Sequence, residues 1–270
     1  IHFAHQTFNW SNEAKSNAAV HVVIIGFAQF DSTNKRIFEY ENIKSNAHEK
    51  SAKNINAYLV EGDDIVIEKR RKPLCNVLNI IKGNYYAKSE GLIIEEKDLD
   101  YLVKNEPNAK KWIKLLIGAD EFINNRKRYC LWLVDCPPDE LRKMPLVMER
   151  VNRVREDRLK STDKGMQNLA PIRFRETNNP DKCIVIPVVS SEKRPYIPIG
   201  FIDKNTISTN GNLIIPNGDL FLFGQLTSLM HMAWVKYTCG RLKSDYRYSK
   251  DLVYNNYPFP KNVSEKQKKA

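Results

Sequence analysis

The longest apolar stretch of this sequence runs from Leu220 to Val235 and limits the folds that the chain can adopt. It is interrupted by Gln, Thr, Ser and His and is shorter than the ~20 residues that a membrane-spanning helix requires. Asp219 can cap a helix through Thr238, and Gly240 is placed to stop it. A helix that is apolar on nearly all sides belongs in a protein core. The sequence therefore predicts a globular protein with no membrane partner.

Short segments with strand and helix patterns precede this apolar stretch. Pro145 can begin a helix that presents Val147, Val151 and Val154 on one stripe. The further predicted helices are 96–104 and 108–117, and the predicted strands are 128–134, 172–175, 183–189, 196–202 and 213–215. Strands and helices mixed in this order favour the α+β class.

The N-terminal part has a different pattern. Residues 20–30 and 36–40 read as two strands joined by the polar turn 31–35, which predicts a hairpin at the edge of a sheet. Residues 42–56 are rich in Asn, Lys, Ser and Ala and predict a linker, with a domain boundary near 45–55. No secretion signal is recognised, and the chain reads as though it enters in the middle of a domain.

Charge and cysteine content narrow the class of partner. Lys and Arg number 43 against 32 Asp and Glu, which gives a net charge of +11 and a pI near 9.3. A surface with this excess of positive charge suits nucleic-acid phosphates. The five cysteines are scattered without metal-binding spacing, so the sequence predicts neither disulfides nor a structural metal and fits the reducing cytoplasm.

Several segments, in the same order along the chain, carry a family resemblance. They are TFNWSNEA (7–14), AAVHVVIIGF (18–27), GADEFIN (118–124), RYCLWL (128–133), VSSE (189–192), YIPIG (196–200), GRLKSDYRYS (240–249) and VYNNYP (253–258). Together they resemble the MmeI-like, or type IIL, restriction–modification enzymes, which fuse an adenine-N6 DNA methyltransferase to a target recognition domain. The resemblance covers almost the whole chain.

The resemblance implies a fold and an activity. It implies the tail of a class I methyltransferase sheet, formed by the hairpin, followed by a mixed α/β target recognition domain. The expected parts are 1–45 (methyltransferase end), 46–95 (linker and start of the recognition region), 96–258 (recognition domain) and 259–270 (basic tail). The complete enzyme would use S-adenosylmethionine and bind double-stranded DNA, and we expect a monomer.

The catalytic elements of that family are not found in this sequence. The family's Gly-rich cofactor loop and its Asn-Pro-Pro-aromatic motif have no counterpart, since Pro137-Pro138 lies in a different context. We therefore expect no catalytic residues and no S-adenosylmethionine binding in these 270 residues. Alone, they should be inactive.

Chemistry on an adenine amino group requires the base to leave the duplex and stack on a new platform. Phe8 matches by position the family segment whose aromatic ring stacks the flipped adenine, and Trp10 is its neighbour. The alternative is that both rings only cover the end of the sheet. Asn9, Ser11 and Asn12 could bond the base or hold the loop, and the sequence does not separate these roles.

Base reading is expected after the predicted helix stop at Gly240. If the chain there is extended, Lys243, Asp245 and Arg247 face one side together. A lysine donates to guanine and an aspartate accepts from cytosine, so Lys243 and Asp245 suit one G·C pair, as the family's similar stretch implies. A solvated turn is the alternative. Asn210 and Gly211 are further candidates for contacts with bases.

Phosphate contacts would fix the position of the protein on DNA without carrying sequence information. The candidates share a basic or hydroxyl side chain, and they are Arg150, Arg153, Ser190, Ser191, Lys193, Arg194 and Arg241. For the arginines of 149–160 a solvated helix face with internal ion pairs is an equal alternative. His231 and Gln225 lie in the apolar stretch, and we expect them to be core residues rather than catalytic residues.

Two other functions compete with this interpretation. Asp63, Asp64 and Glu68-Lys69-Arg70 resemble a nuclease metal motif, but Lys follows Glu directly and the run borders the predicted linker. A non-enzymatic RNA- or DNA-binding module would also explain the charge, although no known reader motif is present. The upstream genomic sequence would separate these interpretations.

Overall fold

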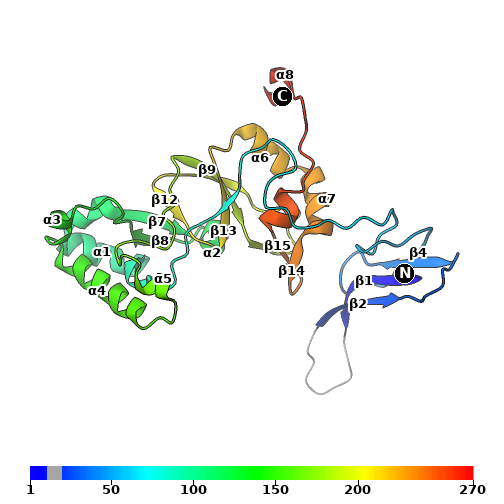
Figure 1. The fold of residues 1–270 in the computed structure, drawn as a ribbon, viewed down its shortest axis with the longest axis horizontal. Coiled ribbons are helices and arrows are strands. Elements are labelled where there is room, and N and C mark those ends of the chain that lie inside the picture. Colours follow the sequence, from blue (N-terminus) through cyan, green and yellow to red (C-terminus); the bar gives the residue numbers. More distant parts are fainter. Residues whose placement is uncertain (11–19, 270) are drawn as a thin grey trace, which may run out of the picture. The chain divides into compact units, whose positions relative to one another are not determined.

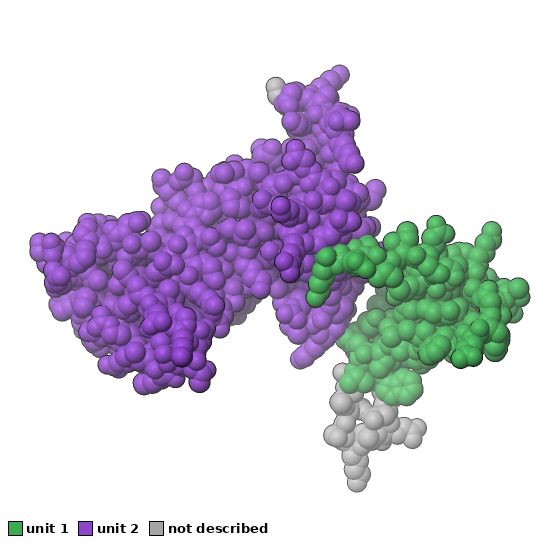
Figure 2. Space-filling model, viewed as in Figure 1, with its two compact units in different colours: residues 1–69 green, residues 70–270 purple. Residues whose placement is uncertain are grey.

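The computed structural model describes residues 1–10 and 20–269 of the chain. Ser11 and Asn12 lie outside the described residues. The chain divides into two compact units, unit 1 with residues 1–69 and unit 2 with residues 70–270 (Figure 2). Each unit is described by itself.

Unit 1 is built on a sheet with the strand order β2-β1-β3-β4 within its described residues (Figure 1). The strands are β1 (Phe3–Trp10), β2 (Val20–Gly26), β3 (Lys35–Glu39) and β4 (His48–Ala52). Strand β1 runs antiparallel to β2 and parallel to β3, and β3 pairs antiparallel with β4. Ala4, Ile37, Ala52 and Ile55 form a small buried core.

The predicted N-terminal hairpin is wrong in its pairing. Strand β1 lies between the two strands that we expected to pair. A break in register between His5 and Phe8 interrupts the period-2 alternation of β1, which hides this strand in the sequence. The predicted linker is also wrong over His48–Ala52, because this polar, mostly exposed segment forms the edge strand β4.

Unit 2 contains the remaining elements of the described chain. Its strands are β5 (Ile81–Lys82), β6 (Ile93–Glu95), β7 (Ile113–Ile117), β8 (Arg128–Leu131), β9 (Lys182–Pro187), β10 (Val189–Ser190), β11 (Gly200–Asp203), β12 (Thr206–Ser208), β13 (Asn212–Pro216), β14 (Gly240–Leu242) and β15 (Asp245–Arg247). Its helices are α1 (Glu96–Asn105), α2 (Ala119–Asn124), α3 (Pro138–Leu141), α4 (Pro145–Leu159), α5 (Lys164–Gln167), α6 (Leu220–Leu226), α7 (Leu229–Thr238) and α8 (Glu265–Lys269), with 3-10 turns η1 (Glu90–Leu92) and η2 (Pro107–Trp112) and the π-helical turn η3 (Lys250–Tyr254). In the described part, no helix is long and apolar enough to cross a membrane.

Two large apolar clusters hold unit 2 together. One packs the sheet β11-β9-β13-β5 against α6, α7 and η3. The other packs the sheet β12-β7-β8-β6 against α1 and α4. A smaller buried group joins the two sheets through Ile117 of β7, Cys183 and Val185 of β9, and Ile214 of β13. Side chains buried on this scale dominate the stability of such a body.

Several expected elements of unit 2 are found close to their predicted bounds. Helices α1 and α4 and strands β8, β9 and β13 lie within the predicted segments or differ by a residue or so at their ends. The second predicted helix, 108–117, is wrong: it is the 3-10 turn η2 followed by strand β7. Residues 172–175 form no strand, and in 196–202 only the end is extended in β11.

The predicted apolar helix 219–238 is two helices. The Asp219 carboxylate caps α6 as expected, accepting from the Leu222 amide at 2.8 Å. The chain then turns at Thr227, and Ser228 caps α7 by accepting from the His231 amide at 3.1 Å. A hydroxyl that satisfies a free amide favours a new start over continuation. Gly240 does not end this helix in a left-handed conformation and instead begins β14.

Candidate nucleic-acid interface

Residues 240–247 form a short antiparallel hairpin that follows α7 directly. Arg241 pairs with Tyr246, and Leu242 with Asp245, so Lys243 and Ser244 form a two-residue turn. Lys243 has a φ of 58°, the left-handed conformation that such turns require. The expectation of one extended segment with Lys243, Asp245 and Arg247 on one side is therefore wrong for Lys243, which lies exposed at the tip.

The guanidinium of Arg241 holds this hairpin. It stacks over the ring of the buried Tyr246 at 3.9 Å from the centroid. It also donates to the backbone oxygens of Ser244 at 3.4 Å and Lys236 at 3.2 Å. These contacts tie the turn and the last turn of α7 to one side chain. We predicted that Arg241 contacts a phosphate, but the two guanidinium nitrogens named above donate to backbone oxygens of the protein itself.

The strand β15 alternates between buried and solvent-facing side chains. Tyr246 and Tyr248 are buried, whereas Arg247 is exposed and Asp245 half-buried. The Tyr248 hydroxyl lies 2.9 Å from Nε2 of the buried His231. Burial lowers the pKa of His231 to about 4 and raises the pKa of Tyr248 well above its usual value. Beneath the hairpin these two groups are thus neutral at pH 7.

The expectation that His231 lies in the core is confirmed by its burial, and Gln225 is half-buried in α6. Nothing in the geometry of either side chain points to catalysis. His231 instead packs edge-on against Tyr257 with 4.6 Å between ring centroids.

The loop after β10 is joined to the hairpin. Strand β10 pairs with β15, with Ser190 opposite Tyr246. The Asp245 carboxylate accepts from the Glu192 amide at 3.3 Å, and the Arg194 amide donates to the Ser191 oxygen at 3.1 Å. Of the predicted phosphate ligands here, Ser191, Lys193 and Arg194 lie on this loop and are partly or fully exposed.

Ser190 does not fit the predicted phosphate contact. Its side chain is 2% exposed, and within the described residues its hydroxyl has no hydrogen-bond partner. It faces the interior because it alternates with Val189 along β10.

Val188 joins the hairpin to a second loop. Its amide donates to the Gly211 oxygen at 2.9 Å, and its oxygen accepts from the Tyr248 amide at 2.8 Å. The Asn210–Gly211 turn therefore lies next to the strand that carries Asp245 and Arg247. Base-reading candidates that are far apart in the sequence meet here, together with the loop 191–194.

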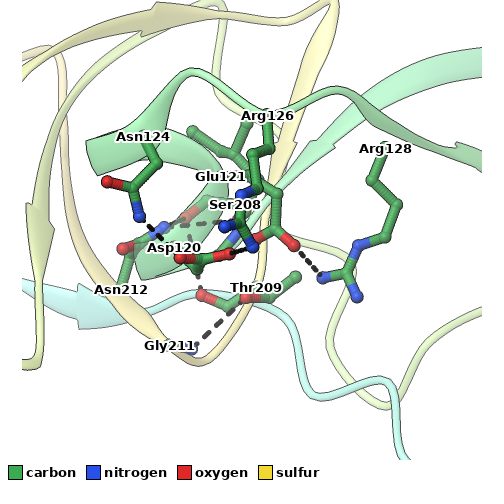
Figure 3. A network of polar contacts seen from close by, with 11 residues as sticks. Asp120, Glu121, Asn124, Arg126, Arg128, Ser208, Thr209, Gly211 and Asn212 are labelled. Carbon is green, nitrogen blue, oxygen red and sulfur yellow. Dashed lines mark hydrogen bonds and ion pairs between the residues drawn. The ribbon is translucent and has the colours of Figure 1, made fainter. Parts of the chain in front are cut away.

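A polar network supports the Asn210–Gly211 turn from behind (Figure 3). The Gly211 amide donates to the Thr209 hydroxyl at 3.4 Å, and the buried Asn212 amide group donates to the Ile117 oxygen at 3.2 Å. Glu121 accepts from the Gly118 amide at 2.7 Å and pairs with Arg128 at 3.0 Å. These contacts fix the start of α2 and the adjacent turn.

The arginines of α4 lie elsewhere. In Figure 1 helix α4 is at the opposite end of unit 2 from β14 and β15. The half-buried Arg150 donates to the oxygens of Gly91 at 3.3 Å and Ile93 at 3.0 Å, and Arg153 pairs with Glu149 at 2.7 Å. Arg150 is a structural residue in this geometry, which argues against its predicted phosphate contact. For Arg153 the alternative of a paired, solvated helix face agrees with the structure.

In unit 1 the predicted stacking residues belong to an aromatic cluster. Phe8 is part of strand β1. It stacks on Tyr40 with 5.1 Å between centroids, and Trp10 lies 6.2 Å from Phe8 with 47% of its surface exposed. His5 stacks on Phe38 at 4.1 Å and lies 2.8 Å from the Tyr40 hydroxyl.

Sequence reasoning missed several of these supporting residues. Tyr40 and His5 complete the aromatic cluster, and Tyr246 and Tyr248 hold the hairpin. The alternation of charge and tyrosine in Asp245-Tyr246-Arg247-Tyr248 is a signal that could have identified the last two. No group of metal-ligating side chains occurs among the residues that the structure describes, including Asp63, Asp64 and Glu68.

Comparison with known families assigns both parts of the chain. The family model of the MmeI target recognition domain matches residues 61–261, and that of the MmeI DNA-methyltransferase domain matches residues 1–39. The chain is 40% identical over 264 residues to DNA methyltransferase A of Bacillus subtilis (strain 168). That match covers 96% of this chain and 29% of the relative.

A solved structure is similar over the whole chain. It is that of the type IIL restriction–modification enzyme MmeI in complex with DNA, with a TM-score of 0.90 and 43% identity. The match covers 100% of this chain and 36% of the solved one. The present chain thus spans about a third of the length of these relatives.

Proposed function

The chain belongs to the MmeI family, and we propose from this that unit 2 reads the DNA sequence for a site-specific adenine-N6 DNA methyltransferase. The observation that carries the proposal is the meeting of the β14–β15 hairpin, the loop 191–194 and the Asn210–Gly211 turn around Val188. A hairpin and loops presented by a rigid body are suited to the major groove of duplex DNA.

The hairpin offers donors and an acceptor to base edges. Lys243 and Arg247 are exposed and can donate to guanine. Asp245 uses Oδ1 for the Glu192 amide, and within the described residues Oδ2 has no hydrogen bond. That oxygen can accept from a cytosine amino group, and Lys243, two residues before Asp245 at the tip of the hairpin, is proposed to donate to the guanine of the same G·C pair. Lys193 and Arg194 on the adjoining loop would meet phosphates.

The complete enzyme is proposed to flip its target adenine and to methylate N6 with S-adenosylmethionine. Phe8, already stacked on Tyr40, would extend an aromatic platform to the flipped base, with Trp10 beside it. The 270 residues of this chain would not bind the cofactor. The described cysteines are all free thiols, which suits the cytoplasm, where we place the enzyme as a monomer.

Selection from duplexes with a randomised central stretch tests the reading role. The chain should enrich a defined motif. The double substitution Lys243→Glu with Asp245→Arg should change one preferred pair from G·C to C·G, with about 1 to 3 kcal/mol lost on the original pair. An exchange of Asp157 near the end of α4 with Lys160, the residue just after α4, is also neutral in net charge and serves as control. Recovery of the random library by the unaltered chain would contradict the proposal.

Cofactor binding is tested separately. Titration calorimetry of the chain with S-adenosylmethionine should show no heat of binding. Binding of S-adenosylmethionine at micromolar concentration would show a cofactor site within these residues and contradict that part of the proposal.

A further inference from the structure

We infer that Arg70, Arg71 and Lys72, here called the basic run, contact the DNA phosphates that flank the base pairs read by the β14–β15 hairpin. The inference rests on the function proposed above. It adds a binding site on a segment for which the sequence suggested only a weak nuclease motif.

The charge of the basic run is not neutralised within the protein. Arg70, Arg71 and Lys72 are all exposed residues. In the described residues none of them forms an ion pair, whereas Arg153, Arg128 and Lys111 each pair with a carboxylate. Three adjacent unpaired cations attract a polyanion, and arginine offers planar donors that match phosphate oxygens.

The backbone beneath these side chains is fixed. The Arg70 amide donates to the Asp251 oxygen at 2.9 Å, and the Asn255 side chain donates to the Arg70 oxygen at 2.7 Å. The Leu74 amide donates to the Asn255 oxygen at 2.7 Å, and Asn255 is itself 2% exposed. A site whose backbone is held in advance loses less conformational entropy when a ligand binds.

The basic run lies near the hairpin. Asp251, which accepts from the Arg70 amide, is in η3 and follows Arg247 of β15 by a few residues. Four fully extended residues span at most about 14 Å, so Asp251, to which the Arg70 amide is bonded, lies within that reach of the foot of the hairpin. The major groove is about 12 Å wide, so phosphates at its edge are accessible to the basic run when β14 and β15 face the bases.

The test is a DNA titration of the chain at several salt concentrations. In the variant Arg70→Gln, Arg71→Gln, Lys72→Gln, the slope of log K against log salt should be smaller by about 2 to 3, since each phosphate contact contributes about 0.9. The motif selected from randomised duplexes should stay the same, because phosphate contacts carry no sequence information. Arg70→Lys with Arg71→Lys should keep the slope, because the charge is retained.

The matched control removes three other exposed lysines of unit 2 that form no ion pair in the part of the chain that the structure describes. It is Lys97→Gln, Lys104→Gln, Lys110→Gln, on α1 and η2 beside the other sheet. An equal loss of slope in this control would show an effect of net charge alone and overturn the inference. An unchanged slope in the basic-run variant would do the same. Failure of the unaltered chain to bind any duplex would instead refute the proposed function.

A different partner is also distinguishable. Tighter binding to an RNA duplex of the same sequence than to DNA, lost in the basic-run variant, would overturn the assignment to DNA. Unchanged melting temperatures of both variants are expected, because the substituted side chains are exposed.

Discussion

At the residue scale, the shape of the β14–β15 hairpin depends on the side chain of Arg241. Its ring contact with Tyr246 and its two backbone acceptors connect α7, the turn and β15. A phosphate ligand needs only a positive charge at the right place, whereas this role needs a planar group with several donors. The two roles can be separated by substitution.

Arg241→Lys is expected to weaken base preference and to leave salt dependence unchanged. Loss of the stacking and of one backbone bond should cost about 1 kcal/mol, or roughly a fivefold loss of preference for the selected motif. Competition titrations with matched and mismatched duplexes measure the preference. If Arg241→Lys behaves like the unaltered chain while Arg241→Ala lowers the salt slope by about 0.9, Arg241 is a phosphate contact.

His231 should make the stability of unit 2 depend on pH. Its pKa in the folded protein is about 4, below the value of 6.5 expected when unfolded, so the unfolded state binds the proton more readily. The stability from keeping His231 neutral is complete above pH 6.5 and is lost as the pH falls through about 4. The full difference is on the order of 3 kcal/mol.

Urea unfolding at pH 7 and pH 4.5 checks this dependence. His231→Gln, which can still bond the Tyr248 hydroxyl, should be less stable at pH 7 but should lose less stability on acidification. An equal loss in both proteins would assign the acid sensitivity to other groups.

At the element scale, the sequence predicts those elements whose signals are local. Helix α4 begins at a proline and shows an apolar stripe of Val147, Val151 and Val154, all buried. Strand β1 was missed because a bulge breaks its alternation, and β4 because an edge strand needs no apolar face. The break at Ser228 depends on a competing cap that an apolar pattern does not show.

The candidate site was predictable in its residue types but not in its geometry. Lys243, Asp245 and Arg247 were identified by their chemistry and by family resemblance. Lys243 lies in the turn and the other two residues lie in β15, because the backbone of Lys243 is left-handed. A lysine in the sequence does not indicate that conformation. The burial of Ser190 and the half-burial of Arg150 could not be predicted, because they result from the tertiary packing of β10 and α4.

Gly83 supports the Asn210–Gly211 turn from the neighbouring strand end. A Cβ atom at this position would lie 2.1 Å from the Thr209 oxygen, which is backbone and cannot rotate away. The backbone oxygen of the adjacent Asn84 accepts a hydrogen bond from the Asn210 amide at 3.0 Å. The turn and this segment are therefore packed backbone to backbone.

Gly83→Ala should displace the Thr209–Asn212 segment and destabilise unit 2 by roughly 1 to 3 kcal/mol. It should also change the DNA motif selected, since the turn adjoins β15 through Val188. Gly224→Ala is the control, because a Cβ there meets nothing within 4 Å. Equal stability of the two variants in denaturant would contradict the packing argument.

At the scale of the whole molecule, unit 1 exposes large apolar side chains along and beyond its strand β2. Strand β2 is at the end of the sheet order, and Val23 is 46% exposed. Beyond β2, Phe27 is 79% and Phe30 71% exposed. A long apolar edge strand is a site of intermolecular pairing unless further protein covers it. The DNA-reading candidates lie in unit 2, which has its own large cores.

The last prediction concerns the separated unit 2. A protein of residues 70–270 should fold, remain monomeric as its concentration rises, and bind duplex DNA with the salt slope of the full chain, because the reading loops and the basic run are all included. The full chain should associate with concentration through β2, and Val23→Thr with Phe27→Ser and Phe30→Ser should reduce that association. Light scattering and sedimentation measure both proteins. If residues 70–270 associate as strongly as the full chain, the surface that mediates association lies in unit 2, and the assignment to β2 is refuted.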